Sequence, residues 1–160
     1  MKNVTVIGGG VLGSQIAFQV AYSGFRVKVW LRSESSIERT KAKLEKLRKT
    51  YVDSINDMKN KKTQNWCYGI SNFENFNADE CFKKISNAYD NITLELDLEE
   101  SIKDADLIIE SMSEDFKAKR DLYKKISPFV RRDTIVVTNS STMLPSKLAR
   151  YTKYPDMFLE

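Results

Sequence analysis

Hydrophobic and polar positions in the first part of the chain follow two rhythms, one typical of strands and one typical of helices. Asn3–Ile7 and Val27–Leu31 are short runs rich in β-branched residues, as expected of buried strands. Between them, Val11–Tyr22 repeats apolar residues at helical spacing, and Gly24 follows where a helix commonly ends in a left-handed residue. The pattern therefore predicts a strand, a helix and a second strand.

A long polar helix is predicted next, because its apolar residues form a single stripe. Six apolar residues from Ile37 to Met58 are spaced 7, 3, 4, 4 and 3 positions apart. The segment Asn60–Asn77 lacks such a rhythm, and Ala78–Tyr89 predicts a shorter helix that returns antiparallel to the first. We therefore expect a helical hairpin to be inserted after the second strand.

The rest of the chain alternates between predicted strands and helices. Further strands are predicted at Ile92–Leu96, Leu107–Glu110 and Thr134–Thr138, and helical segments at Leu98–Asp104, Glu114–Val130 and Pro145–Tyr151. This alternation is typical of a mostly parallel sheet with helices on both faces. The predicted fold class is α/β, a Rossmann-type sheet in which residues 1–160 form one dinucleotide-binding domain.

Charge is unevenly distributed, with a basic surplus in the predicted hairpin. The chain has a net charge of +4, and the stretch Arg32–Lys62 alone holds ten Lys or Arg and five Asp or Glu. A solvated helix face explains such a surplus, and a ligand with several phosphates is the functional alternative.

Membrane and metal functions find no support in the sequence. No apolar run approaches the ~20 residues that a spanning helix requires, and the chain enters its first strand without a secretory leader. Cys67 and Cys81 lack metal-ligand spacing, and the chain has no histidine to assist them. No metal site is predicted, and two free thiols are expected in a cytoplasmic protein.

A glycine turn stands between the first strand and the first helix. Gly8, Gly10 and Gly13 follow the G-x-G-x-x-G spacing, and Val11 and Leu12 lie within it. The first glycine permits a tight turn, the second lets a pyrophosphate approach the backbone, and the third lets helix and strand pack closely. The free N–H groups of the helix start would hold the pyrophosphate, so all five residues are predicted to bind a dinucleotide.

The end of the second strand departs from the usual dinucleotide pattern. An acid that accepts the ribose 2′-hydroxyl is expected there, and Leu31 stands in its place. Arg32 and Ser33 follow and could pair with a 2′-phosphate, whereas Glu34 is a possible substitute acceptor for the hydroxyl. The cofactor is predicted to be NAD or NADP, with NADP favoured.

Two later stretches, "DADLIIESMSEDFKAKRDLY" and "TIVVTNSSTMLPSKLA", complete an arrangement of motifs in order. With the glycine turn and the hairpin, the chain resembles the N-terminal domain of the 3-hydroxyacyl-CoA dehydrogenase family, which includes 3-hydroxybutyryl-CoA dehydrogenases. The resemblance covers essentially all residues and is weakest in the hairpin. It implies an oxidoreductase that interconverts L-3-hydroxyacyl-CoA and 3-oxoacyl-CoA, with the hairpin contacting coenzyme A.

The resemblance also implies roles for residues that follow the fourth and fifth strands. Glu110 and Glu114 match two glutamates of the family, and Glu114 corresponds to the one that contacts the cofactor. Lys119 matches a lysine that is also implied to contact the cofactor. Asn139 and Ser141 match an Asn-Thr-Ser segment in which the serine positions substrate and contacts cofactor. All lie where strands end, the expected ligand edge of an open α/β sheet. Structural alternatives exist: Glu114 would favour a helix N-terminus, and Ser141 would cap a turn.

The base implied by the resemblance is not in this chain. The family places a histidine in a His-Phe-x-Asn-Pro stretch, and "KYPDMFLE" is similar to the approach to it. The last strands of the domain and a helical C-terminal domain, which makes a homodimer, are also expected to be absent. The chain alone is therefore expected to bind cofactor without dehydrogenase activity.

Three other functions compete with this interpretation. A related dehydrogenase would act on another small hydroxy acid, and a non-catalytic NAD(P)-sensing module would need no histidine. Nucleic-acid binding by the basic hairpin is disfavoured, because five acids interleave with its ten bases and no recognised motif is present.

Overall fold

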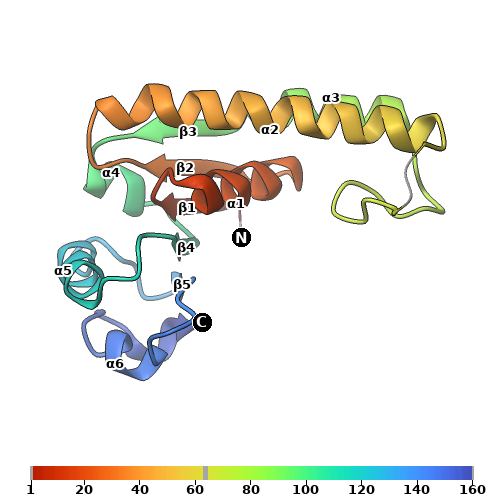
Figure 1. The fold of residues 1–160 in the computed structure, drawn as a ribbon. Coiled ribbons are helices and arrows are strands. Elements are labelled where there is room, and N and C mark those ends of the chain that lie inside the picture. Colours follow the sequence, from red (N-terminus) through yellow and green to blue (C-terminus); the bar gives the residue numbers. More distant parts are fainter. Residues whose placement is uncertain (1, 63–64, 160) are drawn as a thin grey trace.

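We describe the protein from a computed structural model, which covers residues 2–62 and 65–159. These residues form a parallel sheet in the order β3-β2-β1-β4-β5-β6 (Figure 1). The strands are β1 Asn3–Ile7, β2 Arg26–Trp30, β3 Ile92–Glu95, β4 Leu107–Glu110, β5 Ile135–Thr138 and β6 Phe158–Leu159. This is the strand order of a Rossmann-type fold, and the predicted fold class is confirmed.

Helices cover both faces of the sheet and divide the core into two clusters. The helices are α1 Val11–Tyr22, α2 Ser35–Lys59, α3 Ala78–Asp90, α4 Leu98–Ile102, α5 Phe116–Ile126 and α6 Pro145–Ala149. Helices α1, α2 and α3 pack with β2 in one cluster, and α4, α5 and α6 pack with β4 and β5 in the other. A parallel sheet needs this two-sided cover, because both of its faces are apolar.

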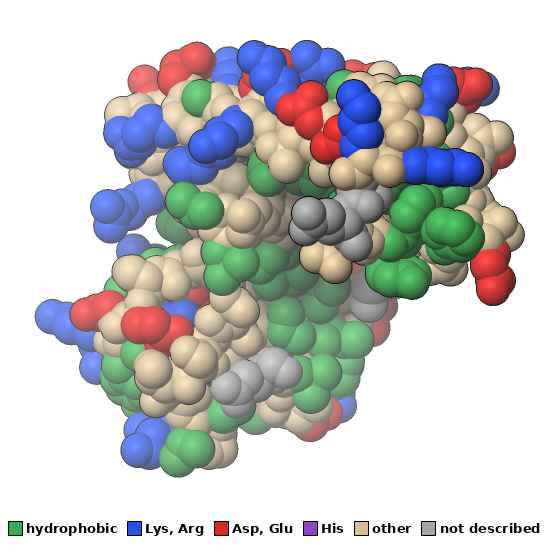
Figure 2. All heavy atoms as spheres, turned by 45° about the vertical axis from the view of Figure 1, so that its right-hand side comes forward, with side chains coloured by type: hydrophobic (Ala, Val, Ile, Leu, Met, Phe, Trp, Pro, Cys, Tyr) green, Lys and Arg blue, Asp and Glu red, His purple; other side chains and the backbone are tan. Residues whose placement is uncertain are grey.

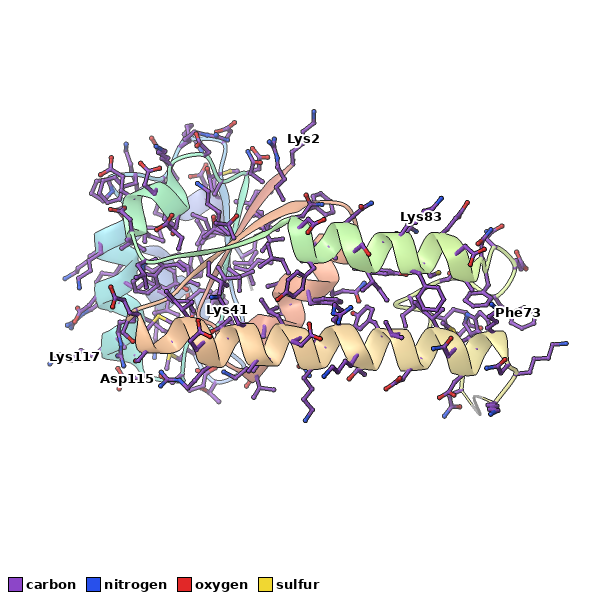
Figure 3. All side chains as sticks on the ribbon, turned by 90° about the horizontal axis from the view of Figure 1, so that it is seen from above. Lys2, Lys41, Phe73, Lys83, Asp115 and Lys117 are labelled. Carbon is purple, nitrogen blue, oxygen red and sulfur yellow. The ribbon has the colours of Figure 1, made fainter. Side chains whose placement is uncertain are left out.

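The predicted helical hairpin is confirmed as α2 and α3, which lie side by side (Figures 1 and 3). The hairpin extends from the sheet to a far end that carries Phe73 (Figure 3). Tyr51 of α2 meets Phe18 and Tyr22 of α1 edge to face, with ring centroids 4.8 and 5.3 Å apart. Aromatic contacts of this kind and buried Leu44 fix the near half of the hairpin on α1.

Most element boundaries lie within one or two residues of the predictions, and larger or more informative differences occur at α5, β2 and β6. Helix α5 begins at Phe116 rather than Glu114, because the Asp115 side chain accepts a hydrogen bond from the Ala118 amide at 2.6 Å and caps the helix. It ends at Ile126, since Pro128 has no backbone N–H with which to continue the helical hydrogen bonds. Strand β2 lies one residue earlier than predicted. A short strand, β6, pairs with β5 in a segment for which no strand was expected.

A buried polar network joins the ends of β4 and β5 to α5. Glu110 and Lys119 have no exposed side-chain surface, and the Lys119 ammonium lies 2.7 and 2.6 Å from the two Glu110 carboxylate oxygens. The same carboxylate accepts hydrogen bonds from the Tyr123 hydroxyl (3.0 Å), the Thr138 hydroxyl (2.7 Å) and the Met112 amide (2.6 Å). Burial and the Glu110 charge raise the pKa of Tyr123, so its hydroxyl stays a donor.

The amino ends of the central strands β1 and β4 are fixed by the carboxylate of Asp106. One oxygen accepts the Lys2 and Asn3 amides at 2.6 and 3.0 Å, and the other accepts a hydrogen bond from Arg131 at 2.9 Å. The two amides and then Arg131 hold the pKa of Asp106 well below its usual range. The charged carboxylate therefore ties the start of β1 to the turn before β4.

The part of the chain that the structure describes contains no helix with both the length and the apolar character needed to cross a membrane. Cys67 and Cys81 are free thiols, and Cys81 is buried in the core between the hairpin and α1.

Replacing Lys119 with methionine is expected to destabilise the fold strongly. The variant leaves the Glu110 charge buried without its cation, and breaking a buried pair in this way costs about 3–5 kcal/mol. The measurement is the free energy of unfolding from denaturant titration. Lys117→Met, on an exposed position of the same helix, is the control and should change stability by less than about 0.5 kcal/mol. Equal stability of the two variants would show that the pair is dispensable.

Removing the charge of Asp106 is expected to flatten the acid dependence of stability. A lowered folded-state pKa adds stability above the unfolded value of about 3.9, and this stability is lost as pH falls further. The parent should therefore lose stability between about pH 4 and 2 more steeply than Asp106→Asn. Asp133→Asn is the control, because Asp133 is 78% exposed and pairs only with Arg131 in the described contacts. Identical acid unfolding of parent and Asp106→Asn would contradict the assignment.

Candidate cofactor site

The candidate site is a cavity at the carboxyl ends of β1, β2 and β4. It has a volume of about 350 Å³. Figure 2 shows basic side chains over a hollow on this side of the molecule, between the hairpin and the half that carries β4 and β5. The lining residues come from the glycine turn, the end of β2, the first turns of α2 and the loop after β4: Gly8, Gly9, Gly10, Trp30, Leu31, Arg32, Ser36, Arg39, Thr40, Lys43, Ser111, Met112 and Ser113. Strand order reverses between β1 and β4, where ligands of open α/β sheets bind.

The glycine turn has the shape that a pyrophosphate requires. Gly8 has a φ of +110°, and a Cβ there would lie 2.8 Å from the Ser111 carbonyl oxygen. A Cβ on Gly13 would lie 2.0 Å from the Gly8 carbonyl oxygen, so only glycine lets α1 approach the turn. A Cβ on Gly10 would meet no atom within 4 Å. The protein itself therefore leaves the space over Gly10 open, which fits a ligand phosphate close to the backbone.

The start of α1 offers unpaired amide groups to the same space. Gly10 is the residue before the helix, and neither a capping side chain nor an acid lies in the first turn. By contrast, side chains of Asn77, Asp97 and Asp115 cap α3, α4 and α5. Free N–H groups and the helix dipole favour an anion at this end. The turn and the helix start together fit the pyrophosphate of a dinucleotide.

Leu31 packs against the glycine turn at Gly9. It is 2% exposed, and a Cβ on Gly9 would come within 2.5 Å of the Leu31 Cδ2 and 2.3 Å of the Thr40 hydroxyl. The leucine therefore fills the place where a ribose-binding acid was expected and presents no hydrogen-bond acceptor there. The sequence shows that no acid stands at this position, and the structure shows that a buried apolar side chain packs against Gly9 instead.

One face of α2 completes the cavity, and sequence reasoning did not assign it. Ser36, Arg39, Thr40 and Lys43 lie at positions i, i+3, i+4 and i+7, which form a single helix face. The Lys43 ammonium donates to the Gly9 carbonyl oxygen at 3.1 Å, and Arg39 donates to the Ser36 hydroxyl at 3.1 Å. The helical spacing of these four polar residues is visible in the sequence. Assigning them to the site requires knowing that α2 begins beside the glycine turn, which the sequence does not show.

The charge of the cavity wall is entirely positive among the described residues. Arg32, Arg39 and Lys43 line the cavity, and no Asp or Glu lines it. Glu38 pairs instead with Lys41 at 2.9 Å on the exposed side of α2. The cavity is therefore suited to an anionic ligand.

Glu114 connects the loop after β4 to the loop after β5. Its carboxylate accepts hydrogen bonds from the Ser140 hydroxyl at 2.7 Å and the Thr142 hydroxyl at 3.1 Å. The bond from Ser140 is the largest cause of the lowered pKa of Glu114. Asn139 and Ser141 flank buried Ser140 and are exposed at the carboxyl end of β5. The loop that carries Ser141 is thus held by a charged carboxylate.

The remaining predicted residues lie in three different environments. Val11 and Leu12 are 68% and 48% exposed at the start of α1. Ser33 is exposed, and its hydroxyl lies 3.1 Å from those of both Ser35 and Ser36. Glu110 and Lys119 do not line the cavity. Their polar atoms lie in the buried network, which reaches the cavity through the Met112 amide.

Comparisons with known proteins agree with this geometry. Residues 3–160 match the family model described as 3-hydroxyacyl-CoA dehydrogenase, NAD binding domain. Human mitochondrial hydroxyacyl-coenzyme A dehydrogenase is 28% identical over 158 residues, which is 99% of this chain and 45% of that protein. The 3-hydroxybutyryl-CoA dehydrogenase of Clostridioides difficile is 29% identical over 153 residues, covering 96% of this chain and 46% of that protein.

Solved structures of similar fold include a reductase and a dehydrogenase. A diketoreductase superposes with a TM-score of 0.79 at 35% identity, covering 99% of this chain and 48% of the other. The (S)-3-hydroxybutyryl-CoA dehydrogenase of Ralstonia eutropha, at 21% identity and a TM-score of 0.75, shares the fold over 99% of this chain and 47% of the other. This chain spans about half the length of the relatives it matches. It belongs to the 3-hydroxyacyl-CoA dehydrogenase family, within which it matches the NAD-binding domain.

Proposed function

We propose that the chain is the cofactor-binding part of an oxidoreductase that interconverts L-3-hydroxyacyl-CoA and 3-oxoacyl-CoA with NAD(P). The observation that carries the proposal is the cavity itself. It joins a glycine turn with open space over Gly10, an uncapped helix start and a wall with three cations and no acid. Bound nicotinamide would supply hydride transfer at the substrate's C3 carbon.

The cofactor is proposed to be NADP(H) rather than NAD(H). Leu31 offers no acceptor to a ribose hydroxyl, whereas Arg32 lines the cavity directly after it. Ser33 lies beside Arg32 and presents an exposed hydroxyl. A guanidinium binds a phosphate through a charge-assisted contact that a plain ribose cannot form.

The substrate is proposed to reach the cofactor along the groove between α1 and α2. A second cavity of about 290 Å³ lies there, lined by Val11, Gln15, Lys43, Lys46, Leu47 and Thr50. Its apolar side chains suit a pantetheine chain, and its two lysines suit the phosphates of coenzyme A. Ser141, exposed after β5, would hold the substrate oxygen, with the Glu114 contacts positioning its loop.

The base is proposed to come from outside these residues, because the chain contains no histidine. The relatives are about twice as long, which leaves room for a helical C-terminal domain that completes the site and forms a homodimer. Glu110 and Lys119 would then act on the cofactor through the Met112 loop. We expect this chain to bind cofactor with negligible turnover.

A second candidate is an oxidoreductase that acts on a different carbonyl compound. The observation in its favour is the similarity to a diketoreductase, a protein described as acting on dicarbonyl compounds. Binding of free coenzyme A separates the two candidates, since only the first requires it.

Gly10→Ala is expected to impair dinucleotide binding without affecting the fold. The added methyl meets no protein atom but occupies the space proposed for the pyrophosphate, so the Kd for NADPH should rise at least about tenfold. Calorimetric titration measures the Kd, and thermal unfolding checks the fold. The control is Gly69→Ala, whose Cβ would lie 3.7 Å from the Gln19 side-chain oxygen, far along the hairpin. Unchanged NADPH affinity in Gly10→Ala would refute the proposed pyrophosphate position.

Lys46→Glu is expected to weaken binding of coenzyme A about fivefold or more, because it reverses a charge beside the proposed phosphate path. NADPH affinity should change by less than twofold, since Lys46 does not line the cofactor cavity. Lys49→Glu carries the same charge change on the same helix outside both cavities and serves as the control. A parent chain that binds NADPH but not coenzyme A would favour the second candidate.

A further inference from the structure

Helix α2 presents a hydrogen-bonded basic face to the cofactor cavity, and its arrangement goes beyond the loop residues Arg32 and Ser33. Arg39 is exposed, and among the described residues one of its guanidinium donors is held by the Ser36 hydroxyl at 3.1 Å. Ser36 in turn lies 3.1 Å from the Ser33 hydroxyl. Arg39 is therefore oriented along the cavity wall before any ligand binds.

The position of this face relative to the glycine turn is fixed by buried contacts. Thr40 is 1% exposed and Leu44 is 4% exposed, so this part of α2 is packed into the core. The Thr40 hydroxyl and the Lys43 ammonium both approach the Gly9 carbonyl oxygen, at 3.4 and 3.1 Å. Arg39 is on the same face, one residue before Thr40, and is thus held at a set distance from the turn.

We propose that Arg39, held by Ser36, is a cofactor-discriminating residue that binds a phosphomonoester on the adenosine ribose, the 2′-phosphate of NADP(H). Lys43 ties this face of α2 to the glycine turn that would hold the pyrophosphate. The inference rests on the proposed function, because it assumes that a dinucleotide occupies the cavity. It assigns the discrimination to the inserted hairpin in addition to the end of β2.

The ribose phosphate is favoured over the pyrophosphate as the partner of Arg39. The pyrophosphate belongs at the start of α1, and the adenosine ribose belongs at the end of β2 in this fold. Arg39 lines the cavity together with Leu31 and Arg32, at that strand end. Because Leu31 provides neither an acceptor nor a negative charge there, a phosphate gains attraction and meets no repulsion.

The test compares the Kd values of NADPH and NADH for the parent chain and for Arg39→Ala. The parent should bind NADPH at least about tenfold more tightly than NADH, and Arg39→Ala should lose most of that preference with NADH changed less than twofold. Lys41→Ala is the matched control, because Lys41 lies on α2 (Figure 3) and pairs with Glu38 outside the cavity. Ser36→Ala should weaken NADPH binding less than Arg39→Ala does, since Arg39 keeps its charge and loses only its hydrogen bond to the Ser36 hydroxyl.

Two fragments identify the phosphate. Adenosine 2′,5′-bisphosphate should bind the parent and be weakened by Arg39→Ala, whereas adenosine 3′,5′-bisphosphate, the nucleotide end of coenzyme A, should be unaffected. Tighter binding of the 3′,5′ isomer that depends on Arg39 would overturn the proposal and assign the residue to coenzyme A. Equal loss of NADPH and NADH, or loss of neither, would also overturn it. Failure of both dinucleotides to bind the parent would overturn the proposed function itself. Binding of NADH alone would overturn this inference and the NADP(H) assignment, but not the proposed role as the cofactor-binding part of an oxidoreductase.

Discussion

The carboxyl edge of the sheet depends on one buried carboxylate. Glu110 ends β4, and its two oxygens bind α5 through Lys119, β5 through Thr138 and the next loop through the Met112 amide. A charge taken out of water in this way is tolerated only when a counter-charge and further donors surround it. Among the described residues, no buried side-chain polar atom lacks a partner. Each bond also fixes a position. The loop Ser111–Ser113, which lines the candidate cofactor cavity, is therefore positioned by the buried Glu110 carboxylate through the Met112 amide.

A second constraint couples the inserted hairpin to the cofactor turn. The Gly9 carbonyl oxygen receives hydrogen bonds from Lys43 and Thr40 of α2, and Leu31 fills the space below the same glycine. A side chain at Gly9 would separate these elements. The hairpin is therefore part of the wall of the candidate cofactor site, although its far end extends away from the sheet (Figure 3). The composition alone does not say where the basic surplus of the hairpin acts, whereas this contact places part of it beside the glycine turn.

Most of the fold could be predicted because its signals are local. Strand β4 and helix α1 were predicted with the bounds that the structure shows, since β-branched runs and helical spacing do not depend on distant residues. The glycine turn was predicted for the same reason. The environment of Lys119 could not be, because a fully buried lysine is rare and its partner lies nine residues away on another element. Arg39 and Lys43 were missed because their role depends on where α2 begins in space.

The geometry separates what every dinucleotide shares from what distinguishes one dinucleotide from another. Backbone atoms of the turn and of the start of α1 face the space proposed for the pyrophosphate, and they are indifferent to the ribose. Side chains of Leu31, Arg32 and Arg39 face the space proposed for the adenosine. An acid in place of Leu31 would accept a hydroxyl and repel a phosphate, and both effects would favour NAD(H), so a leucine there removes both at once. The basic face of α2 is useful only after that replacement, because an acid would neutralise it. In the proposed site, the leucine that follows β2 and the arginine on α2 are therefore two parts of one change in charge.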